Sequence, residues 1–311
     1  MNQPTEISNS SISKSVVVVS AASLAYLFLS YILVGFKSDQ LFLVGLVNGL
    51  YYASSQSRKF VTGFSIFAVY WIIFDYMKAF PNYQYNSVHI ESLYDLEKNL
   101  FGINVGQSIL TPNEYWLIHK TTFLNVLTGL FYLTWIPIPL SFATYLFFKD
   151  RPAFYPFALT FVLVNLLGFI IYYLYPAAPP WYVQAHGFDF DPHTPGNTAG
   201  LARFDQYVGA PVFASIYAKS SNVFAAMPSL HSSYPVIVLY HGLRKRMGSV
   251  NWFFGLIMIG IWFSAVYTSH HYVLDVLAGI TCALTGITLF HQLQKTNWLK
   301  AFIRRMVALT A

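Results

Sequence analysis

His271 and Asp275 are the residues whose types and spacing suggest chemistry most directly. They stand four positions apart in the run 264–275, where an apolar segment that should lie in a membrane reaches its end. In a helix, residues at i and i+4 share a face, so the carboxylate would hold one imidazole nitrogen and leave the other nucleophilic. Ionisable residues within a membrane are costly and are usually functional. The spacing predicts half of a catalytic site, with a structural hydrogen-bonded pair as the alternative.

A second histidine, His231, follows a long polar loop and opens another apolar segment within the run Pro228-Ser229-Leu230-His231-Ser232. A lone histidine at a helix start is as often interfacial as catalytic. One that faces the same side of the membrane as His271 could act as a general acid or base. We therefore predict that His231, His271 and Asp275 are the catalytic residues.

The composition indicates an integral membrane protein. The chain of 311 residues is 56% hydrophobic and only 10% charged, which leaves too few charges to cover a soluble globule of this size. Most of its apolar stretches approach the ~20 residues that a helical span requires. We predict an all-α fold, a polytopic membrane helical bundle of about eight spans. The predicted spans are residues 15–36, 41–54, 60–80, 122–148, 154–175, 229–243, 252–269 and 272–290, of which the second and sixth are short.

Basic residues alternate between the two sides as expected for a membrane protein, because cytoplasmic loops collect Lys and Arg. The cytoplasmic clusters would be Lys14; Arg58 and Lys59; Lys149 and Arg151; Arg244, Lys245 and Arg246; and Lys295, Lys300, Arg304 and Arg305. Both termini are then cytoplasmic, and the candidate site faces the opposite side. Compact loops and a single cysteine favour a bacterial inner membrane with a periplasmic site, or a luminal site in a eukaryote. No basic surface interleaved with aromatic residues suggests a nucleic-acid partner.

The pattern divides the chain into five parts. Residues 1–14 are predicted to be a disordered cytoplasmic tail, 15–80 the N-terminal transmembrane helices, and 81–121 an interfacial amphipathic segment. Residues 122–292 would form the catalytic transmembrane core, with an extracytoplasmic loop at 176–228, and residues 293–311 a basic cytoplasmic tail.

The two long extracytoplasmic connections differ in composition. In the first, apolar Leu93, Leu96 and Leu100 alternate with charged residues at helical spacing, which predicts a helix at the membrane surface. The run Thr111-Pro-Asn-Glu114 then predicts a capping box, with a helix that could continue into the fourth span. The second connection, rich in Pro, Gly, Asp and Asn, is predicted to form a lid or substrate loop.

These runs resemble the type 2 phosphatidic acid phosphatase superfamily, whose second motif is Pro-Ser-Gly-His and whose third is Ser-Arg-x5-His-x3-Asp. The matching residues here are 228–231 and 264–275. The chain is most similar to the inositol phosphorylceramide synthase branch, and the similarity covers about residues 113–290. The runs that carry the similarity to this branch are 175–182, 227–232 and 269–272. The resemblance implies a six-helix phosphatase-type core with extra N-terminal helices.

Two departures from the superfamily pattern concern the residues that hold phosphate. The first motif of the phosphatases, Lys-x6-Arg-Pro, is absent, and Ala265 stands where the third motif has Arg. A phosphodiester carries one negative charge and a phosphomonoester nearly two, so a site with fewer cations suits a diester. Arg203 and Lys219 are the basic residues of the second connection that could hold phosphate or head group, with solvated loop charges as the alternative.

The resemblance implies transfer by two displacements, in which His271 forms a phosphohistidine, Asp275 fixes its tautomer and His231 acts as acid and then base. The start of the helix at Ser229, with the Ser229 and Ser232 hydroxyls, would bind phosphoryl oxygens. The further candidates for substrate contact are Trp181 and Tyr182 in the loop, His270 and Asp75, each with a packing role as the alternative.

The resemblance thus implies transfer of phosphoinositol from phosphatidylinositol to ceramide or dihydroceramide, with release of diacylglycerol. One alternative is a lipid phosphate phosphatase, in which water is the acceptor. A more distant one is a metal-binding or transport membrane protein that uses the same three residues as ligands. No metal or organic cofactor is implied. The oligomeric state is left open.

Overall fold

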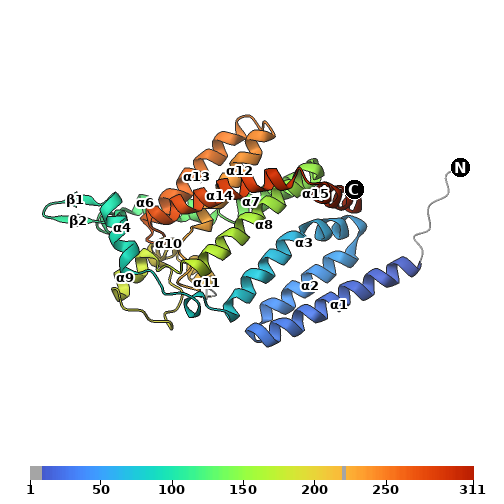
Figure 1. Ribbon diagram of the computed structural model, residues 1–311, viewed down its shortest axis with the longest axis horizontal. Coiled ribbons are helices and arrows are strands. Elements are labelled where there is room, and N and C mark those ends of the chain that lie inside the picture. The colour runs from blue at the N-terminus through green and yellow to red at the C-terminus, as the bar shows by residue number, and fades with distance from the viewer. Residues whose placement is uncertain (1–8, 219–221) are drawn as a thin grey trace. The chain divides into compact units, whose positions relative to one another are not determined.

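The computed structural model describes residues 9–218 and 222–311, which are mostly helical. The all-α prediction is confirmed (Figure 1). The chain divides into two compact units. One runs to Phe80 and includes Ala308–Ala311, and the other is Pro81–Val307.

The N-terminal unit contains α1 (Asn9–Val34), α2 (Ser38–Ala53), α3 (Ser55–Tyr76) and the 3-10 helix η1 (Met77–Ala79). Helix α1 begins six residues before the predicted start of the first span at residue 15, because residues 9–14 contain neither Pro nor Gly to stop it. Residues 1–8 lie outside the described part. Gly35, at φ +75°, ends α1, and the Ser54 hydroxyl accepts the Ser57 N–H to start α3.

The core of the larger unit is a helical bundle. It is formed by α6 (Thr122–Leu133), α7 (Pro137–Lys149), α8 (Arg151–Leu174), α12 (Leu230–Arg244), α13 (Val250–Tyr267) and α14 (Val273–Leu293). Helix α12 packs against α7, α8, α13 and α14 (Figure 1). The predicted span 122–148 is therefore two helices. Pro137 has no N–H to bond to Leu133 and starts a new helix instead.

Among the residues that the structure describes, six helical segments are long and apolar enough to cross a membrane, so the protein is a polytopic integral membrane protein. These segments are Val16–Val34, Ser55–Ala79, Thr122–Lys149, Arg151–Leu174, Val250–Tyr267 and Val273–Leu293. The two short predicted spans correspond to α2 and α12, which have 16 and 15 residues. At 1.5 Å per residue they measure about 24 and 22 Å, less than a typical hydrocarbon core.

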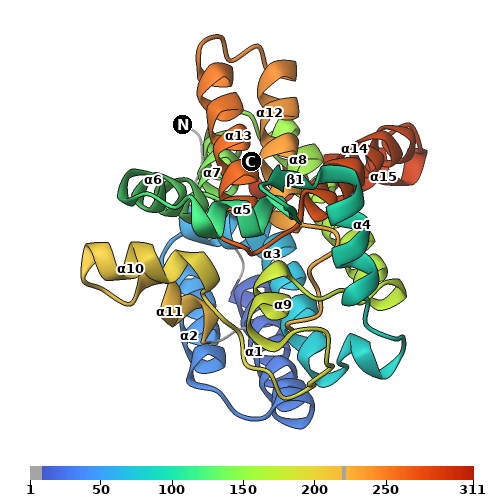
Figure 2. The ribbon, with the colours of Figure 1, turned by 90° about the vertical axis from the view of Figure 1, so that its left-hand side faces the viewer.

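The short elements of the larger unit gather at one end of its bundle (Figures 1 and 2). They are η2 (Asn82–Gln84), α4 (Glu91–Phe101), the hairpin of β1 (Ile103–Val105) and β2 (Ser108–Leu110), α5 (Pro112–Ile118), α9 (Pro180–His186), η3 (Ala199–Leu201), α10 (Ala202–Val208) and α11 (Val212–Tyr217). Within its described residues, the predicted loop 176–228 contains four short helices. Its Ala177 forms bridges to His89 and Ala225, which hold the two long connections together.

The first of these connections largely follows its prediction. The helix of the interfacial segment forms as α4, and the capping box at Thr111 and Glu114 has both of its hydrogen bonds. Helix α5 ends at Ile118, and Thr121 caps a separate helix, α6, so α5 does not continue into the span. The hairpin between α4 and α5 was not predicted.

The opposite end of the larger unit carries basic residues. Lys245, after α12, forms an ion pair with Asp150, between α7 and α8, and the Arg244 guanidinium lies 3.3 Å from Nε2 of His291 in α14. These contacts bring the predicted basic clusters of three connections to one end. The predicted basic tail forms a helix, α15 (Asn297–Thr310).

Candidate active site

His271 lies in a tight turn, residues 268–272, between α13 and α14. Ser269 has φ +60°, and the N–H groups of His270 and His271 both donate to the Ala265 carbonyl, at 3.1 and 3.0 Å. The Asn113 side-chain amide donates to the His271 carbonyl at 2.9 Å. The prediction that His271 and Asp275 share a helix face is therefore wrong, because the helix begins only at Val273.

Asp275 still lies next to His271. Its Oδ2 is 3.5 Å from Nδ1 of His271, and it accepts the Tyr272 N–H at 2.8 Å. The carboxylate thus closes the first turn of α14 and stands behind the imidazole ring. Because Nδ1 faces Asp275, Nε2 is the nitrogen available for chemistry.

His231 meets His271 across the interface between α12 and α14. Nδ1 of His231 lies 3.3 Å from Nε2 of His271 and 3.3 Å from the Tyr132 hydroxyl. The Trp135 ring stands at right angles to the His231 ring, 4.4 Å between centroids. The three predicted catalytic residues therefore form one cluster, to which Tyr132 and Trp135 add a hydroxyl and an aromatic wall.

The backbone fixes the distance between the two histidines. The Ser229 N–H donates to the Asp275 carbonyl at 2.9 Å, and the Ser233 hydroxyl donates to the Gly279 carbonyl at 2.7 Å. A Cβ atom on Gly279 would lie 2.1 Å from the Ser229 carbonyl oxygen. Helices α12 and α14 are thus in direct backbone contact beside the site.

Ser229 and Ser232 are completely buried, and the Ser232 hydroxyl donates to that of Ser229 at 3.0 Å. The Trp262 indole N–H donates to the Ser232 carbonyl at 3.0 Å. Both hydroxyls lie at the start of α12 with His231, as predicted, but they contact each other. Their role in binding phosphoryl oxygens stays a prediction.

Burial controls the protonation of His271. Removal from water lowers the pKa of its imidazole to about 4, opposed by a hydrogen bond to the Ala226 carbonyl. The ring is therefore neutral at pH 7. A neutral imidazole with Nδ1 beside a carboxylate has its lone pair on Nε2, the form that a nucleophile requires.

His270 is enclosed by packing. Its ring stacks on those of Tyr132 and Tyr217, with centroids 5.4 and 4.7 Å away, and its Nε2 lies 3.0 Å from the Thr198 carbonyl. Burial lowers the pKa of His270 well below its usual value. These contacts attach the second connection to the turn 268–272, which carries His271 and is called the catalytic turn below.

The guanidinium group of Arg203 makes contacts within the protein. Its Nε donates to the Asn125 side-chain oxygen at 2.9 Å, and its guanidinium lies over the Tyr267 ring, 5.4 Å from the centroid. Burial lowers the pKa of Arg203 below its usual value, although the group is still a cation at pH 7. Lys219, the other predicted phosphate ligand, lies outside the described residues.

The remaining predicted contacts lie in other surroundings. Trp181 and Tyr182 are buried with Ile90, Ala178 and Phe224 in a core beneath the second connection. The Tyr182 hydroxyl donates to the Asp189 carbonyl at 2.6 Å. These two rings stabilise the folded connection. Asp75 belongs to the N-terminal unit, where Lys78 lies 2.8 Å from its carboxylate.

Sequence reasoning missed Glu97. This residue of α4 has 0% exposure, and its two carboxylate oxygens accept the N–H groups of Val273 and Leu274 at 2.9 and 3.0 Å. Burial raises the pKa of Glu97 to about 7, against the lowering effect of the two hydrogen bonds. It was counted among the charged residues of a surface helix, and its spacing of four residues from Leu93, which places both on one helix face, was the signal available in the sequence.

Comparison with known proteins identifies the family of the chain. Residues 92–289 match the profile of the PAP2 superfamily. The chain is 42% identical over 286 residues to a phosphoinositol dihydroceramide synthase of Bacteroides thetaiotaomicron, covering 90% of this chain and 93% of that protein. It is 29% identical to an inositol phosphorylceramide synthase of Candida albicans, over 64% of this chain and 41% of that protein.

A third relative is an inositol phosphorylceramide synthase catalytic subunit of Schizosaccharomyces pombe, 28% identical over 71% of this chain. The chain spans about half the length of these fungal relatives. No solved structure matches. Within residues 9–218 and 222–311, no group of three His, Cys, Asp or Glu side chains is arranged to hold a metal ion. Since the matched profile covers well over half of the sequence, the chain belongs to the PAP2 superfamily.

Proposed function

We propose that the protein is a phosphotransferase that moves phosphoinositol from phosphatidylinositol to the primary hydroxyl of ceramide or dihydroceramide. The observation that carries this proposal is the arrangement of His271 Nε2, 3.3 Å from His231 Nδ1, with the Asp275 carboxylate behind the nucleophile. The likeness to a bacterial phosphoinositol dihydroceramide synthase over nine-tenths of both chains supports the choice of substrates.

In the first half-reaction, Nε2 of His271 attacks phosphorus and forms a P–N bond. The bond from phosphorus to the diacylglycerol oxygen breaks, and His231, held as an imidazolium by the negative charge of the bound phosphodiester, gives that oxygen its proton. Asp275 stabilises the positive charge that develops on the His271 ring. The products are diacylglycerol, neutral His231 and a phosphoinositol group on His271.

In the second half-reaction, His231 takes the proton of the acceptor hydroxyl as its oxygen attacks phosphorus. The P–N bond breaks and returns its electron pair to Nε2 of His271. The protein is then back in its starting protonation state. One histidine serves both halves, because it lies beside the same nitrogen throughout.

The absence of the phosphatase cations favours a diester over a monoester substrate. Ala265 replaces the Arg of the third motif, and its carbonyl accepts the N–H groups of His270 and His271. This position therefore shapes the catalytic turn and contributes no charge for phosphate. A lipid phosphate phosphatase that uses water as acceptor is accordingly the less favoured function.

The site lies at the end of the larger unit opposite its basic connections. Because basic residues collect on the cytoplasmic side, this placement supports an extracytoplasmic site. With a bacterial relative along nearly the whole chain, we propose the inner membrane as its location and the periplasm as the side that the site faces.

The test is an assay with labelled phosphatidylinositol in vesicles, with and without dihydroceramide. The intact protein is compared with His271→Ala, and His193→Ala, at an exposed loop position, is the matched control. We expect an acceptor-dependent labelled sphingolipid from the intact protein and the control, and none from His271→Ala. Release of free inositol phosphate without acceptor would instead identify a hydrolase.

A further inference from the structure

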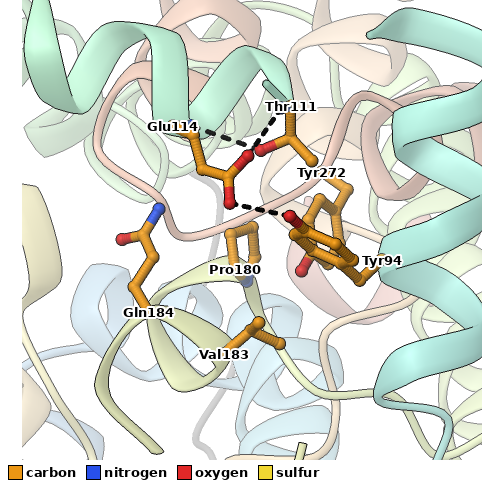
Figure 3. A pocket seen from close by; sticks show the side chains of 7 residues that line it. All are labelled: Tyr94, Thr111, Glu114, Pro180, Val183, Gln184 and Tyr272. Atoms are coloured by element: carbon orange, nitrogen blue, oxygen red, sulfur yellow. Dashed lines mark hydrogen bonds between the residues drawn. The ribbon is translucent and has the colours of Figure 1, made fainter. Parts of the chain in front are cut away.

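A small cavity lies beside the catalytic turn, at the end of the bundle where the short elements gather. Figure 3 shows Tyr94 and Tyr272 on one side, Gln184 on the other and Glu114 above, with Pro180 and Val183 below. These residues come from α4, α5, α9 and the catalytic turn. The cavity is therefore enclosed by both long connections together with the segment that carries His271.

The Tyr272 hydroxyl is an unsatisfied group in this lining. The residue is 1% exposed, and its hydroxyl has no hydrogen-bond partner within the part of the chain that the structure describes. Burying a hydroxyl without a partner is unfavourable, so such groups are normally satisfied by protein, water or ligand. Its placement in the wall of a cavity indicates a ligand with hydrogen-bonding groups.

The other polar groups of the lining suit a neutral polyol. Glu114 accepts the Tyr94 hydroxyl at 2.9 Å and the Thr111 N–H at 2.8 Å, which leaves acceptor positions on the carboxylate for hydroxyl donors. Glu114 is the charged residue of the lining, and the Lys98 ammonium just outside it lies 3.3 Å from the Tyr94 hydroxyl, so the two charges offset each other and a neutral group suits the cavity better than a phosphate. Pro180 and Val183 offer an apolar surface to the C–H groups of a ring.

The cavity is connected to the reacting groups through the backbone. Tyr272 directly follows His271, and consecutive Cα atoms are about 3.8 Å apart. The Gln184 amide donates to the Ser269 hydroxyl at 3.1 Å, and the Trp181 N–H donates to the Ser269 carbonyl at 3.0 Å. A ligand in the cavity thus lies against the turn that presents the nucleophile.

We propose that this cavity binds the polyhydroxylated ring of the donor lipid's head group, with Glu114 and Tyr272 as the residues that select it. The inference rests on the proposed function, because it assigns the inositol ring to one place and leaves the phosphoryl group at the histidines. Glu114 and Tyr272 would hydrogen-bond ring hydroxyls, and a head group without a ring would leave both unsatisfied. The protein would select against such a donor lipid because these hydrogen bonds are lost.

The test compares Tyr272→Phe and Glu114→Gln with the intact protein. The KM for phosphatidylinositol is measured at saturating dihydroceramide, and the KM for dihydroceramide is measured at saturating phosphatidylinositol. Gln at position 114 keeps an oxygen to accept the Thr111 N–H, so the cap of α5 can survive. The matched controls are Tyr115→Phe, which lies outside the lining, and Glu91→Gln, which is exposed on α4. Thermal denaturation of each variant tests its folding.

We expect the KM for phosphatidylinositol to rise about threefold to tenfold in each variant, as for one lost hydrogen bond, with the KM for dihydroceramide unchanged. Inhibition by soluble inositol 1-phosphate should weaken in parallel, while inhibition by glycerol 1-phosphate should not change. An unchanged KM for the donor, or an equal rise for both lipids, would overturn the assignment of the cavity. If the intact protein does not use phosphatidylinositol at all, the proposed function itself fails.

Discussion

At the scale of single residues, Asp275 has two roles that one substitution can separate. Its Oδ2 accepts the Tyr272 N–H and lies 3.5 Å from His271 Nδ1. Asparagine retains an oxygen for the N–H but has no charge to stabilise an imidazolium. We expect Asp275→Asn to reduce kcat about 10²-fold to 10⁴-fold, with the melting temperature little changed. Single-turnover measurement of phosphohistidine formation, with the exposed Asp95→Asn as control, tests this.

The pH dependence of phosphohistidine formation is a second prediction at this scale. Burial holds the pKa of His271 at about 4, so the nucleophile is neutral above that pH and protonated below it. We expect the contribution of His271 to the rate to be constant from about pH 5 to pH 7 and to fall as the pH approaches 4. A midpoint near 6.5, the value of an ordinary imidazole, would contradict the burial of this ring.

The candidate catalytic residues could be found from the sequence because His231, His271 and Asp275 lie within short runs of distinctive spacing, and the structure brings these three side chains together. Tyr132 and Asn113 could not be found in this way, since each contacts the site from another helix and its hydrogen-bond partner is distant in the sequence. Trp181 and Tyr182 were predicted to contact substrate and instead pack in the core of the second connection. In the sequence alone, an aromatic residue that contacts substrate cannot be told from one that packs in a core.

At the scale of elements, Glu97 couples α4 to the start of α14. Its carboxylate accepts the first two N–H groups of α14, directly before Asp275. We expect Glu97→Ala to lower the free energy of unfolding by about 2–4 kcal/mol, because two buried N–H groups lose a charged acceptor. Transfer activity should fall together with stability. Thermal denaturation and the transfer assay, with Asp95→Ala on the exposed face of α4 as control, measure both effects.

The pH dependence of stability tests the same residue. The pKa of Glu97 is about 7 in the folded protein and 4.5 for an ordinary Glu, so the folded state binds more protons between these values. The contribution of Glu97 to stability is therefore complete below about pH 4.5 and is lost as pH rises through 7. We expect the melting temperature of the intact protein to fall over this range relative to that of Glu97→Gln. If the melting temperatures of the two proteins changed in parallel with pH, Glu97 would not titrate between about pH 4.5 and 7.

The helices themselves could largely be predicted, because apolar stretches of span length have few alternatives in a membrane. The break at Pro137 was missed, since residues on both sides of it are apolar and composition does not show where a helix ends. The second connection was predicted to be a loop because its Pro and Gly residues interrupt helical periodicity. It folds into short helices held by contacts to distant residues, such as that of Ala177 with His89.

At the scale of the whole molecule, the separation of the basic connections from the histidines predicts which surfaces a reagent can reach. The chain has one cysteine, Cys282, which is buried. In a Cys282→Ser background, we expect a membrane-impermeant maleimide to label Pro192→Cys, in the second connection, on intact cells. Ser249→Cys, between α12 and α13, should react only after the membrane is opened. The reverse pattern would invert the topology.

The backbone contact between Gly279 and Ser229 has a consequence for the response of the enzyme to its lipid environment. A bilayer that is thicker or thinner than the hydrophobic length of a helix is accommodated by a change in tilt. Because α12 and α14 touch without intervening side chains and are joined by the Ser229–Asp275 hydrogen bond, they must tilt as one body. Membrane thickness would then change the depth of the histidine pair but not the separation of its nitrogens.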